Sequence, residues 1–268
     1  MQELSIQEIR DIQINILNVF AEYCEKSKLN YFLCGGTLIG AVRHKGYIPW
    51  DDDIDVAMLR GDYEKLIESF NGFNSLYKLY NSNEMGKFPF PFSKISYEAS
   101  LLKENTDEKN TYNIGINIDV FPIDTIPEDG KLQKKILGKI SFQRKILNAK
   151  LIKHNRNRSI IKSSILSVGK LVFSFKSIPN VVKKINDLAI SNYSFNSNKL
   201  GIIVWGYGES EIVSNEVFES IVKKEFEGNY YNVPAGYHKW LSSIYGDYMK
   251  FPPLEKQVTH HDFKAFLK

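Results

Sequence analysis

The stretch GGTLIGAVRHKGYIPWDDDIDVAM, residues 35–58, decides the fold of this chain. Before it lies the short apolar segment 31–34, which predicts a strand, and its first residues form a glycine corner leading into an expected helical turn or two over 37–43. After a loop at 46–49, the apolar run 54–59 predicts a second strand with carboxylates at its start. This order of elements indicates a mixed α/β fold with a site at the glycine corner.

The acidic run 51–55 supplies the candidate metal ligands. If it is extended, its side chains alternate between two faces, so that Asp51, Asp53 and Asp55 share one face and Asp52 points away. Carboxylates this close raise one another's pKa unless a cation neutralises them, and Mg²⁺ prefers hard oxygen ligands. An acidic surface turn is the alternative, but an Asp within an apolar strand is costly without a function. We therefore expect Asp53 and Asp55 to bind Mg²⁺ or Mn²⁺.

A third catalytic carboxylate is expected from a neighbouring strand. Asp119 lies between apolar residues in the segment 117–121, as Asp55 does in its own segment. Asp124 is the alternative, but it follows Pro122 and resembles a turn residue. Asp119 is therefore the expected partner of the two metal-binding acids.

The glycine corner is the candidate phosphate site. Glycines let the backbone approach an anion closely, and the N-terminus of the following helix offers free N–H groups and a favourable dipole. The expected phosphate-binding residues are Gly35, Gly36 and Thr37. Nearby cations that could clamp phosphate are Arg43, His44, Lys45 and, on an expected strand, Lys94. Solvated surface cations are the alternative.

The rest of the chain alternates helical and strand patterns. A capping box of Ser5 and Glu8 begins an expected helix over 5–26. Further elements are expected as a helix over 62–70, strands over 76–80, 92–97 and 114–121, and a turn bracketed by Pro122 and Pro127.

Composition indicates an ordinary globular protein. Of the 268 residues, 43% are apolar and 25% are charged. A chain of this size needs no disulfide, so Cys24 and Cys34 are expected to be reduced thiols. The N-terminal sequence lacks the features of a signal peptide, and no run of 18 uncharged apolar residues occurs. We therefore expect a cytoplasmic protein.

One segment is strongly cationic. Residues 131–184 hold 15 Lys and Arg and no Asp or Glu, whereas the other 214 residues hold 20 basic and 31 acidic groups. Apolar residues such as 160–161, 165–166 and 171–173 are mixed with these cations, in a helical pattern. Such an amphipathic element could lie on the inner face of the cytoplasmic membrane, where each basic side chain contributes about 1 kcal/mol. A helical subdomain packed on the catalytic core is the alternative. Nucleic acid is not an expected partner, because the segment is too apolar and carries no recognised binding motif.

Residues 35–58 resemble the signature of the LicD family of bacterial phosphocholine transferases, a group that also includes fukutin and fukutin-related protein. The resemblance extends over almost the whole chain, through the blocks FSKI (92–95), NIDVFPID (117–124), VWGYGE (204–209), FEG (226–228) and YGDYMKFPP (245–253). It implies a nucleotidyltransferase-type mixed sheet with flanking helices. It also implies that Gly36 and Thr37 hold donor phosphate, that Asp53 and Asp55 bind magnesium, and that Asp119 completes the site.

The resemblance implies transfer of a phospho-head group to a glycan hydroxyl. Phosphocholine from CDP-choline, with release of CMP, is the expected reaction, and the acceptor would be a teichoic acid, capsule or lipopolysaccharide precursor, free or lipid-linked. One alternative is transfer of ribitol, glycerol or ethanolamine phosphate from the corresponding CDP-activated donor. Another is a nucleotidyltransferase that moves NMP from an NTP, because the same acids would serve it. A catalytically inactive membrane scaffold is the third, and the intact acids argue against it.

Choline is a quaternary ammonium, which aromatic faces and nearby carboxylates recognise. The candidate cage residues are Trp50, Trp205, Tyr207, Tyr245 and Tyr248, with ordinary packing as the alternative for each. His260 and His261 are only a weak metal signal.

Three parts are expected along the chain. Residues 1–130 would form a nucleotidyltransferase-like catalytic core and 131–190 the basic amphipathic insertion. Residues 191–268 would complete the active site.

Overall fold

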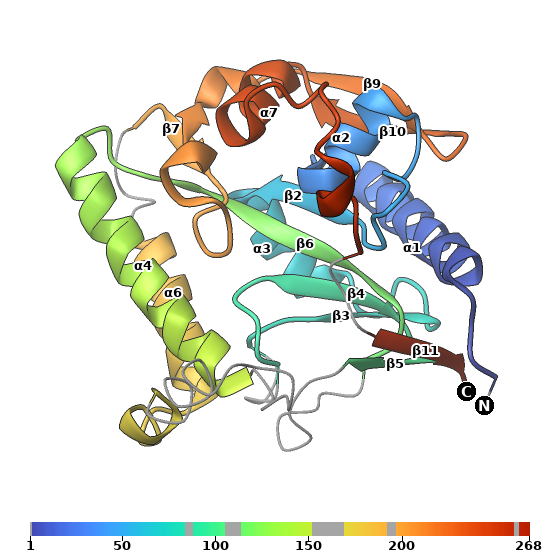
Figure 1. The fold of residues 1–268 in the computed structure, drawn as a ribbon, viewed down its shortest axis with the longest axis horizontal. Helices are drawn as coiled ribbons and strands as arrows, with labels where there is room; N and C mark the ends of the chain where they lie inside the picture. The colour runs from blue at the N-terminus through green and yellow to red at the C-terminus, as the bar shows by residue number, and fades with distance from the viewer. Residues whose placement is uncertain (1, 84–87, 105–113, 152–168, 192–196, 260–262) are drawn as a thin grey trace.

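The computed structural model describes residues 2–83, 88–104, 114–151, 169–191, 197–259 and 263–268. Within these ranges the chain has a mixed α+β fold around a seven-stranded sheet, which confirms the expected fold class (Figure 1). The central strand order is β1-β2-β6-β4-β3, and β7 pairs with β6 while β8 pairs with β7. The strands are β1 (Phe32–Leu33), β2 (Asp55–Leu59), β3 (Tyr77–Tyr80), β4 (Ser93–Tyr97), β6 (Asn117–Thr125), β7 (Lys199–Gly201) and β8 (Val213–Ser214).

Three helices belong to the N-terminal half. Helix α1 (Ile6–Ser27) begins at the expected capping box, in which the Ser5 and Glu8 side chains bond each other's backbone N–H groups. Its buried face, which includes Ile16 and Phe20, packs on the main core. Helix α2 (Gly35–Arg43) starts at the glycine corner between β1 and β2, and α3 (Arg60–Ser69) follows β2 directly.

The turn expected between Pro122 and Pro127 is wrong, because β6 continues through Pro122 to Thr125. The N–H group of Asp119 faces β2, where it bonds the Ile54 carbonyl, so alternation directs the nitrogen of Pro122 to the opposite edge. At that edge β4 pairs with β6 only as far as Val120, and β7 only from Asp124 onward. Pro122 therefore lies where no ladder hydrogen bond is needed.

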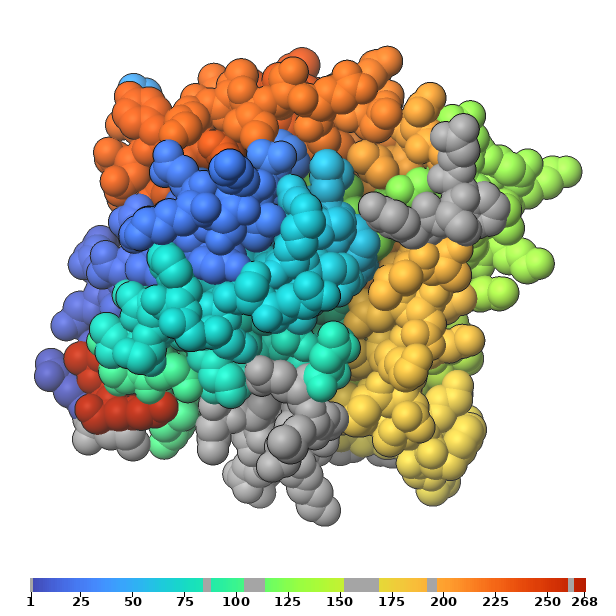
Figure 2. Space-filling view, turned by 180° about the vertical axis from the view of Figure 1, so that it is seen from behind, coloured from blue at the N-terminus to red at the C-terminus, as the bar shows by residue number. Residues whose placement is uncertain are grey.

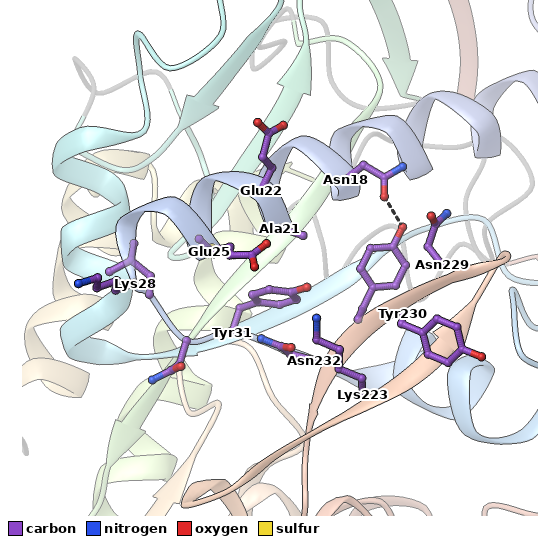
Figure 3. Close-up of a pocket in the computed structure, with 14 residues that line it drawn as sticks. Asn18, Ala21, Glu22, Glu25, Lys28, Tyr31, Lys223, Asn229, Tyr230 and Asn232 are labelled. Atoms are coloured by element: carbon purple, nitrogen blue, oxygen red, sulfur yellow. Dashed lines mark hydrogen bonds between the residues drawn. The ribbon is translucent and has the colours of Figure 1, made fainter.

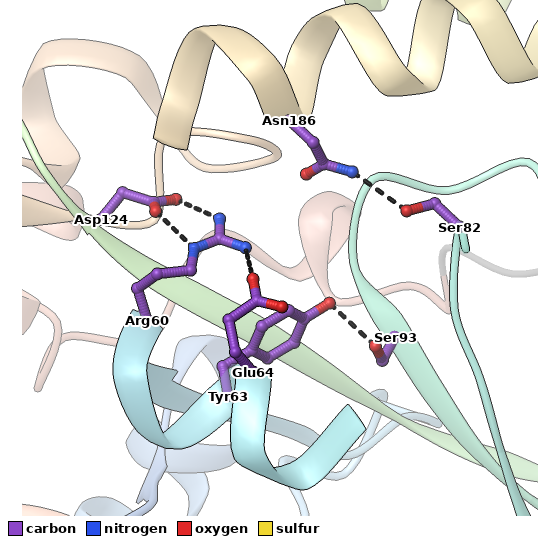
Figure 4. A network of polar contacts seen from close by, with 7 residues as sticks. All are labelled: Arg60, Tyr63, Glu64, Ser82, Ser93, Asp124 and Asn186. Carbon is purple, nitrogen blue, oxygen red and sulfur yellow. Dashed lines mark hydrogen bonds and ion pairs between the residues drawn. The ribbon is translucent and has the colours of Figure 1, made fainter. Parts of the chain in front are cut away.

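The basic segment contributes α4 (Gly130–Leu151) and α6 (Ile178–Ile190), which lie side by side at one margin of the molecule (Figure 1). Their apolar side chains form a second core with Ile126, Ile203 and Val204. Seen from behind, α6 borders the region of α3 and β3 (Figure 2). Asn186 of α6 donates a hydrogen bond to Ser82 at 3.1 Å (Figure 4). These two helices thus pack on each other and on the rest of the fold, as the alternative of a packed helical element expects.

The remaining part of the basic segment is described only at its end. Leu171 and Phe175 are exposed, by 76% and 77%, while residues 160–168 lie outside the described residues. Membrane contact therefore stays a prediction. Among the described residues, no helix is both long and apolar enough to cross a bilayer.

The C-terminal part returns to the core. It contains the hairpin of β9 (Ile221–Phe226) and β10 (Asn229–Pro234), helix α7 (Tyr237–Tyr245), and β11 (Phe263–Leu267), which pairs with β5 (Ser100–Glu104). Short 3₁₀ helices are η2 (Gly208–Glu211), η3 (Asn215–Phe218) and η4 (Leu254–Lys256). A bridge between Glu3 and Phe266 brings the two ends of the chain together (Figure 1).

Candidate active site

A cavity of about 370 Å³ brings the predicted acids together. Asp53, Asp55 and Asp119 all line it, with Gly35 beside them. Asp55 opens β2 and Asp119 lies in the parallel strand β6, directly opposite it in the sheet register. Residues paired in this way point to the same face, so the sheet itself places the two carboxylates side by side.

Lys94 extends this row to a third strand. It is the register partner of Asp119 in β4, and its Nζ lies 2.5 Å from Asp119 Oδ1 and 3.1 Å from Asn117 Oδ1. Its side chain is buried. Lys94 is thus placed beside the acids as an ion-pair partner of Asp119.

The electrostatics of the acid row favour a cation. Burial raises the pKa of Asp55 well above its ordinary value, and the neighbouring carboxylates of Asp53, Asp119 and Asp51 raise it further, against a smaller opposing effect of Lys94. Charged oxygens held this close repel one another, and a divalent cation removes that repulsion. The donor set of carboxylate oxygens therefore fits Mg²⁺ or Mn²⁺.

The glycine corner makes room for these acids. Gly35 has a φ of +55°, and a Cβ added there would lie 2.9 Å from Asp55 Oδ2. A Cβ on Gly36 would overlap the Asp51 carboxylate. Thr37 is buried, and its Oγ1 accepts a hydrogen bond from the Asp55 N–H at 2.8 Å. Gly36 and Thr37 do not belong to the cavity lining. Their binding of phosphate therefore stays a prediction.

Strand β2 begins only at Asp55, so residues 51–54 precede the sheet ladder. Asp51, Asp52 and Asp53 each offer a carboxylate oxygen within 4.8 Å of the others, and Asp52 is buried. Asp52 does not belong to the cavity lining, whereas Asp53 and Asp55 do. Helix α1 holds the segment before β2, because Arg10 donates a hydrogen bond to the Asp51 carbonyl and Gln13 donates one to the Asp52 carbonyl at 3.0 Å.

None of the four predicted phosphate clamps belongs to the cavity lining: Lys94 pairs with Asp119, and Arg43, His44 and Lys45 lie elsewhere. Arg43 donates to the Tyr248 carbonyl at 2.6 Å, and its guanidinium lies 4.7 Å from the ring centre of Phe251. His44 packs edge-on against the same ring, and burial lowers its pKa. Lys45 pairs with Glu225 of β9 at 3.3 Å. All three brace the C-terminal part against α2.

The predicted aromatic residues divide into two groups. Trp205, Tyr207 and Tyr245 line the cavity together with the acids. Trp50 and Tyr248 do not: Trp50 packs against Phe251, and the Tyr248 hydroxyl lies 3.0 Å from His238 Nδ1.

Two charged lining residues were not predicted individually. Glu211 is buried at the end of η2, where Trp240 Nε1 donates to it at 3.0 Å and the Tyr207 N–H at 3.2 Å. Arg144, one of the 15 cations of the basic segment, reaches the cavity from α4, donates to the Gly206 carbonyl at 2.7 Å and lies 4.9 Å from the Trp205 ring centre. No local motif identifies Glu211 as a site residue. The helical pattern of α4 does not distinguish Arg144 from the other cations of the basic segment.

Asp124, the alternative third acid, has a structural role. It lies in β6 rather than in a turn, and its two carboxylate oxygens accept from Arg60 Nε and Nη2, each at 2.7 Å (Figure 4). Arg60 also donates to Glu64 at 3.0 Å. Both members of the pair are buried, so Asp124 serves α3 packing and lies outside the cavity lining.

A second, larger cavity of about 570 Å³ lies between α1 and the β9–β10 hairpin (Figure 3). Tyr31 forms part of its wall, and Tyr231 donates to Asn18 across it at 2.7 Å. None of the predicted site residues lines it. Charge and chemistry, rather than size, therefore identify the smaller cavity as the candidate active site.

Comparisons with known proteins show what the chain is similar to. A family model described as LicD/FKTN/FKRP, nucleotidyltransferase domain, matches residues 28–152. Over 276 aligned positions the chain is 30% identical to the lipopolysaccharide cholinephosphotransferase LicD of Haemophilus influenzae, and the alignment covers 100% of both chains. Uncharacterized proteins of Rickettsia prowazekii and Rickettsia typhi are 40% and 38% identical over 55 and 52 residues, which is 20% and 18% of this chain and 21% and 17% of theirs.

Proposed function

This chain belongs to the LicD family of phosphotransferases, and we propose that it transfers phosphocholine from CDP-choline to a hydroxyl of a lipopolysaccharide or related cell-surface glycan, releasing CMP. The full-length likeness to a cholinephosphotransferase supports the transferred group. One structural observation carries the proposal for this chain. A single cavity is lined by the carboxylates of Asp53, Asp55 and Asp119 and also by aromatic side chains and the further carboxylate of Glu211. The three acids suit a metal-bound diphosphate, and the aromatic side chains with Glu211 suit a cationic head group.

The reaction exchanges one P–O bond for another. The acceptor hydroxyl oxygen attacks the phosphorus that bears choline, the bond from that phosphorus to the CMP oxygen breaks, and the hydroxyl proton leaves to a base. Magnesium held by Asp53 and Asp55 would neutralise the charge on the donor phosphates. Asp119 would serve either as a further metal ligand or as the proton acceptor, and Lys94 donates a hydrogen bond to its carboxylate.

A thermal-shift screen tests the donor. The purified protein is heated with Mg²⁺ and, separately, CDP-choline, CDP-ethanolamine, CDP-glycerol, CDP-ribitol or CTP. A ligand that binds only the folded protein raises its melting temperature, so CDP-choline should give the largest shift. A larger shift with CDP-ribitol or CDP-glycerol would reassign the head group.

Product analysis separates head-group transfer from nucleotide transfer. Head-group transfer releases CMP, whereas transfer of NMP from an NTP releases pyrophosphate. Pyrophosphate formed from CTP, without CMP formed from CDP-choline, would overturn the proposal.

A further inference from the structure

Glu211 is a buried carboxylate in the wall of the catalytic cavity that the transfer chemistry does not use. Its side chain is only 2% exposed, yet it lines the cavity. Trp240 Nε1 donates to one of its oxygens and the Tyr207 N–H donates to the other. Gly206 leaves the space for it, because a Cβ at that position would lie 2.8 Å from Glu211 Cγ. The loop before η2 is thus built around this carboxylate.

Three aromatic side chains share the wall with Glu211. Trp205 packs among Phe90 and Phe92 of the sheet side, so its ring is held firmly. Tyr207 and Tyr245 meet edge to face, with ring centres 5.5 Å apart and their hydroxyls 3.4 Å apart. Tyr207 is 64% exposed, which places the pair at the mouth of the cavity. Aromatic faces next to a carboxylate attract a cation that cannot donate hydrogen bonds.

The described charged residues of the cavity lining are mostly carboxylates, which favours binding of such a cation. The other lining carboxylates are Asp53, Asp55 and Asp119, and Arg144 is the cation of the described lining. Arg144 directs a hydrogen bond to the Gly206 carbonyl and lies over Trp205. Its attraction is smaller than the effect of burial, which raises the pKa of Glu211 to about 7. A positive ligand would therefore stabilise the charged form of this carboxylate.

We propose that Glu211, together with Trp205, Tyr207 and Tyr245, forms the subsite that binds the donor's head group and selects a positively charged head group over a neutral one of the same shape. This inference rests on the proposed function, because it assumes that the donor is a CDP-activated head group. Glu211 supplies charge, and the three aromatic side chains supply the surface that a trimethylammonium group contacts. Asp55 of β2 and Asp119 of β6 remain available for the metal-bound donor phosphates.

The test compares CDP-choline with CDP-3,3-dimethylbutanol, in which a carbon replaces the choline nitrogen and removes its charge without changing its shape. Dissociation constants are measured calorimetrically at saturating Mg²⁺. The wild-type protein should bind CDP-choline at least about tenfold more tightly than the neutral analogue. Equal affinities in the wild-type protein would overturn the inference without any variant.

Glu211→Gln then assigns the selectivity to this residue. Affinity for CDP-choline should fall about tenfold or more, while affinity for the neutral analogue stays unchanged, which also shows that the cavity is intact. Glu209→Gln is the matched control, because Glu209 is a neighbouring carboxylate that is 62% exposed and lies 3.9 Å from Lys134. It should keep the wild-type ratio. If Glu211→Gln weakens binding of both ligands equally, the inference is overturned, and the role of Glu211 is structural, through its hydrogen bonds with Trp240 and Tyr207.

The proposed function fails in a different way. If the wild-type protein binds neither compound and binds CDP-ribitol or CTP instead, the donor assignment is wrong and the subsite falls with it. If CDP-choline binds and is turned over but the neutral analogue binds equally well, the function stands and only the subsite is overturned.

Discussion

Gly35 and Asp55 depend on each other directly. Gly35 has a φ of +55°, and an added Cβ would lie 2.9 Å from Asp55 Oδ2. Replacement of Gly35 by Ala should therefore strain the backbone by about 1–2 kcal/mol and displace the carboxylate. We expect the free energy of unfolding to fall by that amount and kcat/KM to fall at least about tenfold, as measured by urea denaturation and CMP release.

Gly138 provides the control for this substitution. It lies within α4, and a Cβ added there would meet nothing within 4 Å. Gly138→Ala should stabilise the protein by about 0.5–1 kcal/mol and leave activity unchanged. Wild-type activity in Gly35→Ala would contradict the placement of Asp55 at the catalytic centre.

Glu211 should make stability depend on pH. Burial raises the pKa of Glu211 from 4.5 to about 7 in the folded protein. A carboxyl with a raised folded-state pKa contributes stability that is complete below pH 4.5 and is lost as the pH rises through about 7. The free energy of unfolding of the wild type relative to Glu211→Gln should thus fall by on the order of 3 kcal/mol over this range. Urea denaturation at a series of pH values measures this. A constant difference between the two proteins, as expected for Glu209→Gln, would contradict it.

The sequence predicts the lining acids where chemistry and a local strand pattern are enough. Asp53, Asp55 and Asp119 line one cavity, and the apolar neighbours of Asp119 indicate its strand. Glu211 was missed because its burial depends on Trp240, which lies 29 positions away, and on a loop without a sequence pattern. Arg144 was missed because a helix of many cations does not reveal which one faces the cavity.

At the scale of elements, the β2–β6 pair carries the site. The parallel register sets Asp55 opposite Asp119 and the antiparallel β4–β6 register adds Lys94. The individual strands could be predicted from their apolar runs, whereas this register could not. The segment before β2 is held by α1, because Arg10 and Gln13 donate to the carbonyls of Asp51 and Asp52. Those contacts join residues about 40 positions apart, beyond the reach of a local pattern.

The tip of the basic segment, residues 171–176, is predicted to contact a membrane surface. Leu171 and Phe175 are exposed beside Lys176, and the basic segment carries no acidic residue. We propose that this tip contacts anionic lipid, so the wild-type protein should co-sediment with anionic vesicles at low salt and less at high salt. Leu171→Asp with Phe175→Asp should reduce binding about tenfold. Leu254→Asp is the matched control, because Leu254 is 81% exposed and lies in η4, outside the segment. A wild-type protein that does not bind, or a control that binds as poorly as the double variant, would contradict the contact.

At the scale of the whole molecule, distant parts of the chain build one cavity. The lining acids Asp53, Asp55 and Asp119 come from β2, β6 and the segment before β2, and the other lining residues include Arg144 of α4, Glu211 of η2 and Tyr245 of α7. The mixed fold and the three acids could be predicted because strand patterns and the signature are local. The rest of the lining forms only when α4, η2 and α7 pack together, and contacts of α4 and α7 with η2 supply that arrangement.

The central claim is that this cavity transfers phosphocholine through its acid row. The most direct measurement incubates the protein with Mg²⁺, a lipopolysaccharide acceptor and CDP-choline labelled separately in cytidine and choline. We expect equal amounts of CMP and of choline-labelled glycan, with a loss of at least about a hundredfold in Asp55→Asn. Asp187→Asn, on the exposed face of α6, should match the wild type. Equal product formation by the wild type and Asp55→Asn, or no transfer of the choline label, would contradict the account.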